Sequence, residues 1–132
     1  MRVLVLDDDA DRQQAIRRNN PGHDMTGVES ASEAIRLMER DLHEIVMLDH
    51  DLDDYLAPDA SNNGTGLHVV RWITNCDPDC RPSLTVVHST NAVGAGDMMR
   101  ELTEADLPCL YLPEAWARPG LIDRLQSLLL LK

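Results

Sequence analysis

The stretch VLVLDDD at residues 3–9 determines how the rest of the chain is interpreted. Four consecutive apolar residues are typical of a short strand that is buried on both faces of a parallel sheet, and here they are followed directly by three aspartates. The stretch VMLDHDL at residues 46–52 has the same arrangement, since its apolar run ends in Asp49, His50 and Asp51. Ligands of parallel sheets bind at the carboxyl ends of the strands. Two strands that end in acidic residues therefore predict a polar site at that edge.

Apolar strands alternate with amphipathic helices along the whole chain. The predicted strands span residues 3–6, 25–28, 44–48, 82–87 and 109–112. The predicted helices span residues 10–18, 66–74, about 96–102 and 120–131, and a further helix opens at a capping box formed by Ser30 and Glu33. This alternation, with right-handed crossovers, predicts one α/β domain over residues 1–132: a flavodoxin-like (βα)5 doubly wound sandwich with a five-stranded parallel sheet. In the first helix, Arg12, Arg17 and Arg18 are expected to point outward.

Composition excludes several classes of protein. The chain has 132 residues, 43% of them hydrophobic, which suits the core of one domain. Its net charge of −11 argues against general DNA binding and against binding to an anionic membrane, because both need a basic face. The longest apolar run, at residues 128–131, is too short to span a bilayer, and the chain turns acidic too early for a signal peptide. We therefore expect a cytoplasmic protein.

Lysine and cysteine usage narrows the chemistry further. Lys132 is the only lysine, so mechanisms that need an interior lysine are excluded. Cys76, Cys80 and Cys109 are too few and too scattered to indicate a metal site by themselves, and we expect structural or incidental roles for them.

Acidic residues from two strand ends are predicted to meet. If the first and third strands are neighbours, Asp7, Asp8 and Asp49 converge, and three close carboxylates need a compensating charge. A divalent cation is the usual compensation, and oxygen ligands suit Mg²⁺ or Mn²⁺. The alternative, that these acids cap helices and face water, stays open.

Three motifs together, VLVLDDD, VMLDHDL and TGLHVV at residues 65–70, resemble the response-regulator receiver domain over nearly the whole chain. The resemblance implies that Asp7, Asp8 and Asp49 hold Mg²⁺ and that Asp49 accepts a phosphoryl group. Asp51 falls where receivers use a backbone carbonyl to complete the metal shell. Two departures weaken the signalling reading: His88 stands where receivers carry Thr or Ser, and LYLPEAW at residues 110–116 lacks the receiver lysine.

The combination of LDHDL at residues 48–52 with HSTNAVGAG at residues 88–96 resembles a divergent branch, the cyclic-phosphate-processing receiver domains. The added histidines of that branch imply action on cyclic phosphate ends, including those of RNA.

His50 and His88 are the two added groups at the predicted site. An imidazole exchanges protons near neutral pH, so a pair flanking a phosphodiester could act as base and acid. Ser89 and Asn91, with backbone amides near residues 94–96, could hold the phosphate oxygens. We expect His88 to be the catalytic histidine and His50 its partner, with the fourth strand beside the first. Two alternatives stay open: His88 only bridges its strand to the acids, and His50 points away because side chains alternate along a strand.

Three functions are compatible with these residues. The first is a metal-dependent phosphoesterase that acts on a cyclic or diester phosphate, with Asp49, His50 and His88 as its catalytic residues. The second is an atypical signalling receiver, phosphorylated on Asp49 or not, that acts through a protein partner. The third is a scaffold without chemistry. The missing lysine disfavours the second, and the retained acids disfavour the third. The acidic surface repels a long RNA, which favours a small phosphate-containing ligand or a nucleic-acid terminus. The sequence alone does not decide whether the chain is an enzyme.

Overall fold

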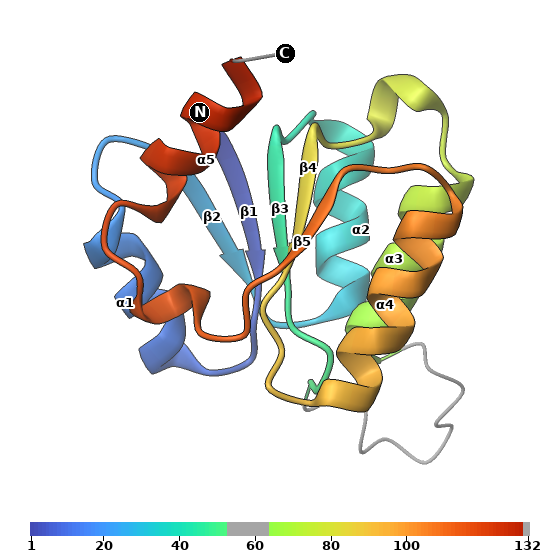
Figure 1. The fold of residues 1–132 in the computed structure, drawn as a ribbon, viewed down its shortest axis with the longest axis horizontal. Helices are drawn as coiled ribbons and strands as arrows, with labels where there is room; N and C mark the ends of the chain where they lie inside the picture. Colours follow the sequence, from blue (N-terminus) through green and yellow to red (C-terminus); the bar gives the residue numbers. More distant parts are fainter. Residues whose placement is uncertain (53–63, 131–132) are drawn as a thin grey trace.

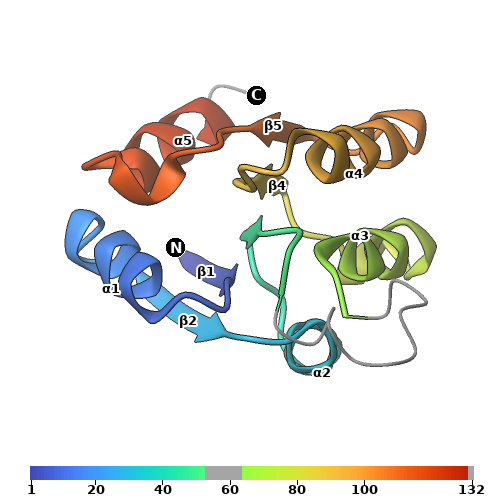
Figure 2. The same ribbon diagram turned by 90° about the horizontal axis from the view of Figure 1, so that it is seen from below.

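A computed structural model describes residues 1–52 and 64–130, and these form one five-stranded sheet with helices on both faces (Figures 1 and 2). The predicted loop at residues 53–63 lies outside the described residues. The strands are β1 (Arg2–Leu6), β2 (Asp24–Val28), β3 (Ile45–Leu48), β4 (Leu84–Val87) and β5 (Cys109–Tyr111). All neighbours pair in parallel, in the order β2-β1-β3-β4-β5. The predicted doubly wound α/β fold is therefore confirmed.

Helices cover the two faces unequally. The helices are α1 (Ala10–Asn19), α2 (Ala31–Arg40), α3 (Gly66–Asn75), α4 (Ala92–Glu104) and α5 (Leu121–Leu130), with 3-10 turns η2 (Pro78–Cys80) and η3 (Ala115–Ala117). In Figure 2, α1 and α5 lie on one face of the sheet, and α2, α3 and α4 on the other. Side chains of β1 alternate between two apolar cores: Leu4 and Leu6 pack in one, and Val3 and Val5 in the other. Among the described residues, no helix is both long and apolar enough to cross a membrane.

Side-chain caps set where the helices begin. Ser30 caps α2, because its Oγ accepts the Glu33 N–H at 3.2 Å, as the predicted capping box requires. The helix α4 begins at Ala92 and not near residue 96 as predicted. Asn91 is its cap, and its Oδ1 accepts the Gly94 N–H at 3.0 Å. The prediction was late because Gly94 and Gly96 are poor helix formers, whereas the helix start is defined by the cap at Asn91.

The sheet hydrogen bonds continue past the strand ends into the residues that follow. The N–H of Asp7 donates to Val28 O, that of Asp49 to Leu6 O, and that of His88 to Leu48 O, each at 3.0 Å. The backbone of these three polar residues is therefore held by the sheet itself. Their side chains emerge beside the point where the strand order reverses, which is where ligands bind in open α/β sheets.

Asn20 joins two helices that are far apart in the sequence. Its Nδ2 donates to Ile16 O at 2.7 Å, and its Oδ1 accepts the Ile122 N–H at 2.9 Å. The side chain is buried, so both bonds are shielded from water. Asn20 thus satisfies a carbonyl near the end of α1 and an amide in the first turn of α5.

Replacing Asn20 by Ala should lower the free energy of unfolding by roughly 1–3 kcal/mol, because the buried Ile122 N–H loses its acceptor. Urea denaturation followed by circular dichroism measures this loss. Asn75→Ala is the matched control, since it removes a 2.7 Å bond from Nδ2 to Arg71 O at an exposed position and should cost much less. Equal losses in the two variants would contradict the bridging role of Asn20.

Candidate functional site

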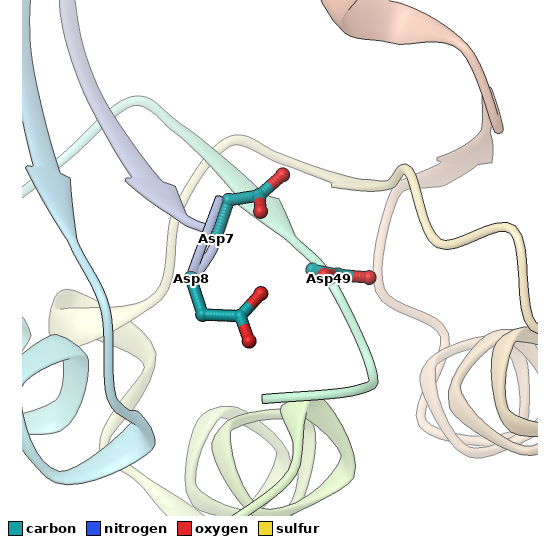
Figure 3. Close-up of side chains that lie close together, drawn as sticks. All are labelled: Asp7, Asp8 and Asp49. Carbon is teal, nitrogen blue, oxygen red and sulfur yellow. The ribbon is translucent and has the colours of Figure 1, made fainter. Parts of the chain in front are cut away.

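Three carboxylates meet at the carboxyl ends of β1 and β3 (Figure 3). Asp7 and Asp8 follow β1, and Asp49 follows β3, which pairs directly with β1. One oxygen from each carboxylate can be chosen so that all three lie within 4.8 Å of one another. Asp7 is fully buried, Asp49 is 6% exposed, and Asp8 is partly buried. The predicted convergence is confirmed, and the cluster is packed into the fold and not spread over its surface.

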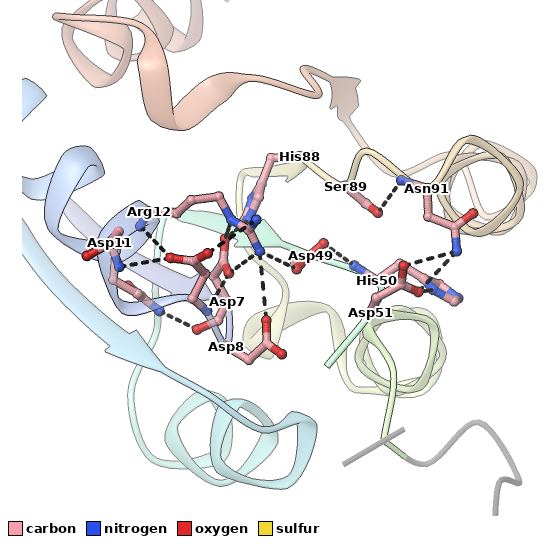
Figure 4. Close-up of polar contacts among 12 residues, drawn as sticks. Asp7, Asp8, Asp11, Arg12, Asp49, His50, Asp51, His88, Ser89 and Asn91 are labelled. Atoms are coloured by element: carbon pink, nitrogen blue, oxygen red, sulfur yellow. Dashed lines mark hydrogen bonds and ion pairs between the residues drawn. The ribbon is translucent and has the colours of Figure 1, made fainter. Parts of the chain in front are cut away.

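Arg12 lies across these carboxylates (Figure 4). Its Nε donates to Asp7 Oδ2 at 2.9 Å and its Nη2 to Asp7 Oδ1 at 2.8 Å, which makes a two-point ion pair. The same Nη2 lies 3.3 Å from Asp49 Oδ2 and 3.8 Å from Asp8 Oδ1. The expectation that Arg12 points outward is therefore wrong. Asp9 caps α1 by accepting the Asp11 and Arg12 N–H groups, and this places Arg12 in the first turn, beside the end of β1.

Burial and charge act in opposite directions on two of these acids. Burial alone would raise the pKa of Asp7, but hydrogen bonds from His88 and Arg12 outweigh it and hold this pKa at about 2. For Asp49, burial and the negative charge of Asp7 raise the pKa above its ordinary value. Arg12 stays protonated, because its hydrogen bond to Asp7 raises its pKa despite burial. Of Asp7 and Asp49, Asp49 is therefore the one whose ionised form this arrangement compensates less.

His88 is buried beside Asp7 and does not lie at the surface. Its Nε2 is 3.1 Å from Asp7 Oδ2, the ring is 1% exposed, and Nδ1 is buried with no hydrogen-bond partner among the described residues. The predicted proximity of His88 to Asp7 is confirmed. The expectation that the fourth strand lies beside the first is wrong. The strand β4 pairs with β3, so His88 reaches Asp7 past the end of β3. This contact matches the alternative in which His88 bridges its strand to the acids, and its catalytic role stays a prediction.

His50 belongs to a second group of polar side chains, beside α4 (Figure 4). Its Nδ1 lies 2.7 Å from Asp51 Oδ1, and Asn91 Nδ2 donates to the same oxygen at 3.0 Å. The imidazole packs so closely on Gly94 that a Cβ there would overlap the ring. His50 thus points toward α4, in line with the alternation of side chains along a strand.

Asp51 is not a member of the group formed by Asp7, Asp8 and Asp49. Burial raises the pKa of the Asp51 carboxyl, but its hydrogen bonds with His50 and Asn91 together outweigh burial and hold this pKa below its ordinary value. These bonds occupy the carboxylate of Asp51. The receiver resemblance assigns the role of metal ligand to the backbone carbonyl of Asp51, and that role stays a prediction.

Ser89 and Asn91, the predicted phosphate ligands, have partners within the protein. Ser89 Oγ is buried and accepts the Asn91 N–H at 3.0 Å, and Tyr111 donates its hydroxyl to the Ser89 carbonyl at 3.1 Å. Both polar atoms of the Asn91 amide are engaged, Oδ1 by Gly94 N–H and Nδ2 by Asp51. Of the amides near residues 94–96, that of Gly94 is thus already used, and that of Ala95 donates to the Asn91 carbonyl at 2.9 Å. A phosphate would have to replace these partners, and the phosphate-binding role of Ser89 and Asn91 stays a prediction.

Gly66 makes room for the end of β3, a role that the sequence did not reveal. A Cβ at this position would overlap the carbonyl oxygen of Asp49, and the Gly66 N–H donates to His50 O at 3.0 Å. The first residue of α3 is thereby held against the loop that carries Asp49. The only sign in the sequence that two backbone segments approach this closely is the glycine itself.

Asp49→Asn should raise the melting temperature of the metal-free protein by about 3 °C, the shift expected for roughly 1 kcal/mol in a domain of this size. The raised pKa means that ionised Asp49 opposes folding above that pKa, so the gain should be full at pH 8 and vanish as the pH falls toward about 4. Thermal melts at both pH values measure it. Asp106→Asn is the control, because it removes the same charge from an exposed residue whose φ of 58° asparagine also tolerates. A lower melting temperature for Asp49→Asn at pH 8 would contradict this account.

Solved structures of receiver domains are similar to the chain in fold. A receiver domain from Methylobacillus flagellatus has a TM-score of 0.64 at 20% identity and is matched over 95% of both chains. A CheY-like receiver domain from Methanospirillum hungatei has a TM-score of 0.59 at 16% identity, over 97% of this chain and 92% of that one. The receiver domain of a putative LuxO repressor from Vibrio parahaemolyticus is 24% identical, with a TM-score of 0.60 over 98% and 87% of the two chains.

No curated protein matches the sequence significantly. A sequence model of the cyclic-phosphate processing receiver domain matches residues 2–104. The matched stretch holds the three clustered carboxylates, Arg12 and both histidines of the site. The chain therefore belongs to the cyclic-phosphate processing receiver domain family.

Proposed function

We propose that this domain binds a divalent cation at Asp7, Asp8 and Asp49 and processes a phosphate ester, such as a cyclic phosphate, beside it. The observation that carries the proposal is the approach of these three carboxylates to within 4.8 Å, two of them in a buried setting. Oxygen donors of this kind suit Mg²⁺ or Mn²⁺. The raised pKa of Asp49 supports the fit, because it shows a carboxylate that would gain from a neighbouring positive charge.

When bound, the cation would orient the phosphate and neutralise its charge. The chain's own contribution is proton transfer. Opening a cyclic phosphate by hydrolysis forms a bond between a water oxygen and phosphorus and breaks one ester P–O bond, which leaves a phosphomonoester and a free hydroxyl. One histidine takes the proton from the water, and the other gives a proton to the departing oxygen.

The two histidines support this division of labour unequally. The 2.7 Å contact of His50 Nδ1 with Asp51 favours the tautomer in which Nε2 is the accepting nitrogen. The His50 side chain is 12% exposed, whereas that of His88 is 1% exposed. This difference favours His50 as the group that meets water or ligand first. His88, the second proposed proton carrier, would act through movement of Asp7 or Arg12.

The net negative charge of the protein limits the kind of ligand that it can bind. A net charge of −11 repels a long polyanion, so we propose a small cyclic nucleotide or the terminus of a nucleic acid as the ligand. The alternative function is a signalling receiver that uses Asp49 and a protein partner. The fold and the position of Asp49 favour that alternative, but the absence of lysine before Lys132 removes a group that receivers use to hold the phosphoryl oxygens.

The purified domain should open 2′,3′- or 3′,5′-cyclic nucleotides when Mg²⁺ or Mn²⁺ is present and not after chelation. Phosphorus NMR measures the phosphomonoester that appears. His50→Ala and His88→Ala should each reduce turnover by about a hundredfold or more, since each removes a proton-transfer group. His68→Ala, on α3, is the control and should retain full turnover.

The same preparation distinguishes the alternative. Incubation with acetyl phosphate should give little lasting phosphoaspartate. Stable phosphorylation of Asp49 with no turnover of cyclic nucleotides would replace the enzyme proposal by the signalling one. Full turnover in both histidine variants would reject the proposed proton transfers.

A further inference from the structure

The guanidinium of Arg12 covers the oxygens that a cation would need (Figure 4). Asp7 Oδ1 accepts from Arg12 Nη2 at 2.8 Å and from the Asp9 N–H at 2.9 Å. Asp7 Oδ2 accepts from Arg12 Nε at 2.9 Å and faces His88 Nε2 at 3.1 Å. Arg12 thus engages both oxygens of Asp7, and a cation that binds Asp7 competes with the guanidinium at either oxygen.

We propose that Arg12 is an internal counter-cation that a divalent cation displaces, and that the released guanidinium then binds the phosphate of the ligand. The proposal rests on the function proposed above and deepens it, because it assigns to this chain the residue that recognises the phosphate. It also sets an order of binding, with the cation before the anion.

Charge explains why Arg12 occupies this position. Four carboxylates surround its guanidinium, since Nη1 also lies 3.7 Å from Asp9 Oδ2 in addition to the contacts with Asp7, Asp8 and Asp49. One positive charge offsets part of the repulsion among them. A divalent cation carries twice that charge at a single point, so it compensates the same oxygens more fully and removes the need for the guanidinium.

The placement of Arg12 suits a second role after displacement. Its side chain is 31% exposed and belongs to the first turn of α1, so the head group can leave the carboxylates without disturbing the buried residues Ala15 and Ile16 of that helix. A guanidinium presents two parallel N–H donors that match two oxygens of a phosphate. Displacement would thus convert a group that faces carboxylates into one that faces an anionic ligand beside the cation.

Calorimetric titration with Mg²⁺ tests the displacement. Arg12→Ala should bind Mg²⁺ more tightly than the wild type, by about tenfold, which is within the usual range of coupling between two binding events. Arg18→Ala is the matched control, because it removes the same charge from an exposed position on the same helix and corrects for the change in net charge. Arg12→Gln keeps a donor for Asp7 and provides the measurement if the alanine variant does not fold.

Titration with inorganic phosphate at saturating Mg²⁺ tests the second role. The wild type and Arg18→Ala should bind phosphate, and Arg12→Ala should lose about tenfold in phosphate affinity although it binds Mg²⁺ better. If Arg12 only stabilised the fold, its replacement would not be expected to raise the affinity for Mg²⁺ and lower the affinity for phosphate at the same time.

Each other outcome has a definite meaning. An unchanged or weaker Mg²⁺ affinity in both Arg12 variants would overturn the displacement, and an unchanged phosphate affinity would overturn the phosphate-binding role. The expected binding changes without turnover of cyclic phosphates would reject the proposed enzyme function alone. Turnover together with an unchanged Mg²⁺ affinity in Arg12→Ala would reject this inference alone, and no Mg²⁺ binding by any variant would reject both.

Discussion

Electrostatic repulsion among Asp7, Asp8 and Asp49 is the constraint around which this end of the molecule is organised. The sheet imposes it, because the hydrogen bonds that pair β1 with β3 continue through the Asp49 N–H and leave the carboxylates little freedom to separate. Arg12 and His88 both respond to it, and both contact Asp7, the most buried of the three. An arrangement of this kind opposes folding unless each charge finds a partner.

The two histidines, although both follow strand ends, occupy different environments. His88 is enclosed under Asp7, and its position depends on the buried interior of the sheet. His50 is held from outside by Asp51, Asn91 and the close surface of Gly94. The imidazole of His50 is therefore the more accessible of the two, since 12% of its side chain is exposed against 1% for His88. Two residues of one type, each next to a strand end, thus differ in exposure and in hydrogen-bond partners.

Much of this architecture could be predicted from the sequence, because it depends on periodicity. Apolar runs identified all five strands, and two of them ended in acids that had to meet once β1 and β3 were neighbours. Arg12 could not be placed in this way. The amphipathic pattern of α1 assigns it outward, but a residue in the first turn of a helix lies beside the strand end that precedes it. The contact of Gly66 with the Asp49 carbonyl and the cap at Asn91 were also missed, because both depend on three-dimensional approach and not on pattern.

The amide of Asn91 has a consequence that extends beyond the site. One end of the amide caps α4 and the other holds Asp51, which in turn orients His50. The two contacts fix the orientation of the amide, because a half-turn would place Nδ2 against the Gly94 N–H and Oδ1 against the Asp51 carboxylate. The start of α4 and the orientation of His50 therefore depend on one and the same side chain, so a change at either end of the amide is felt at the other.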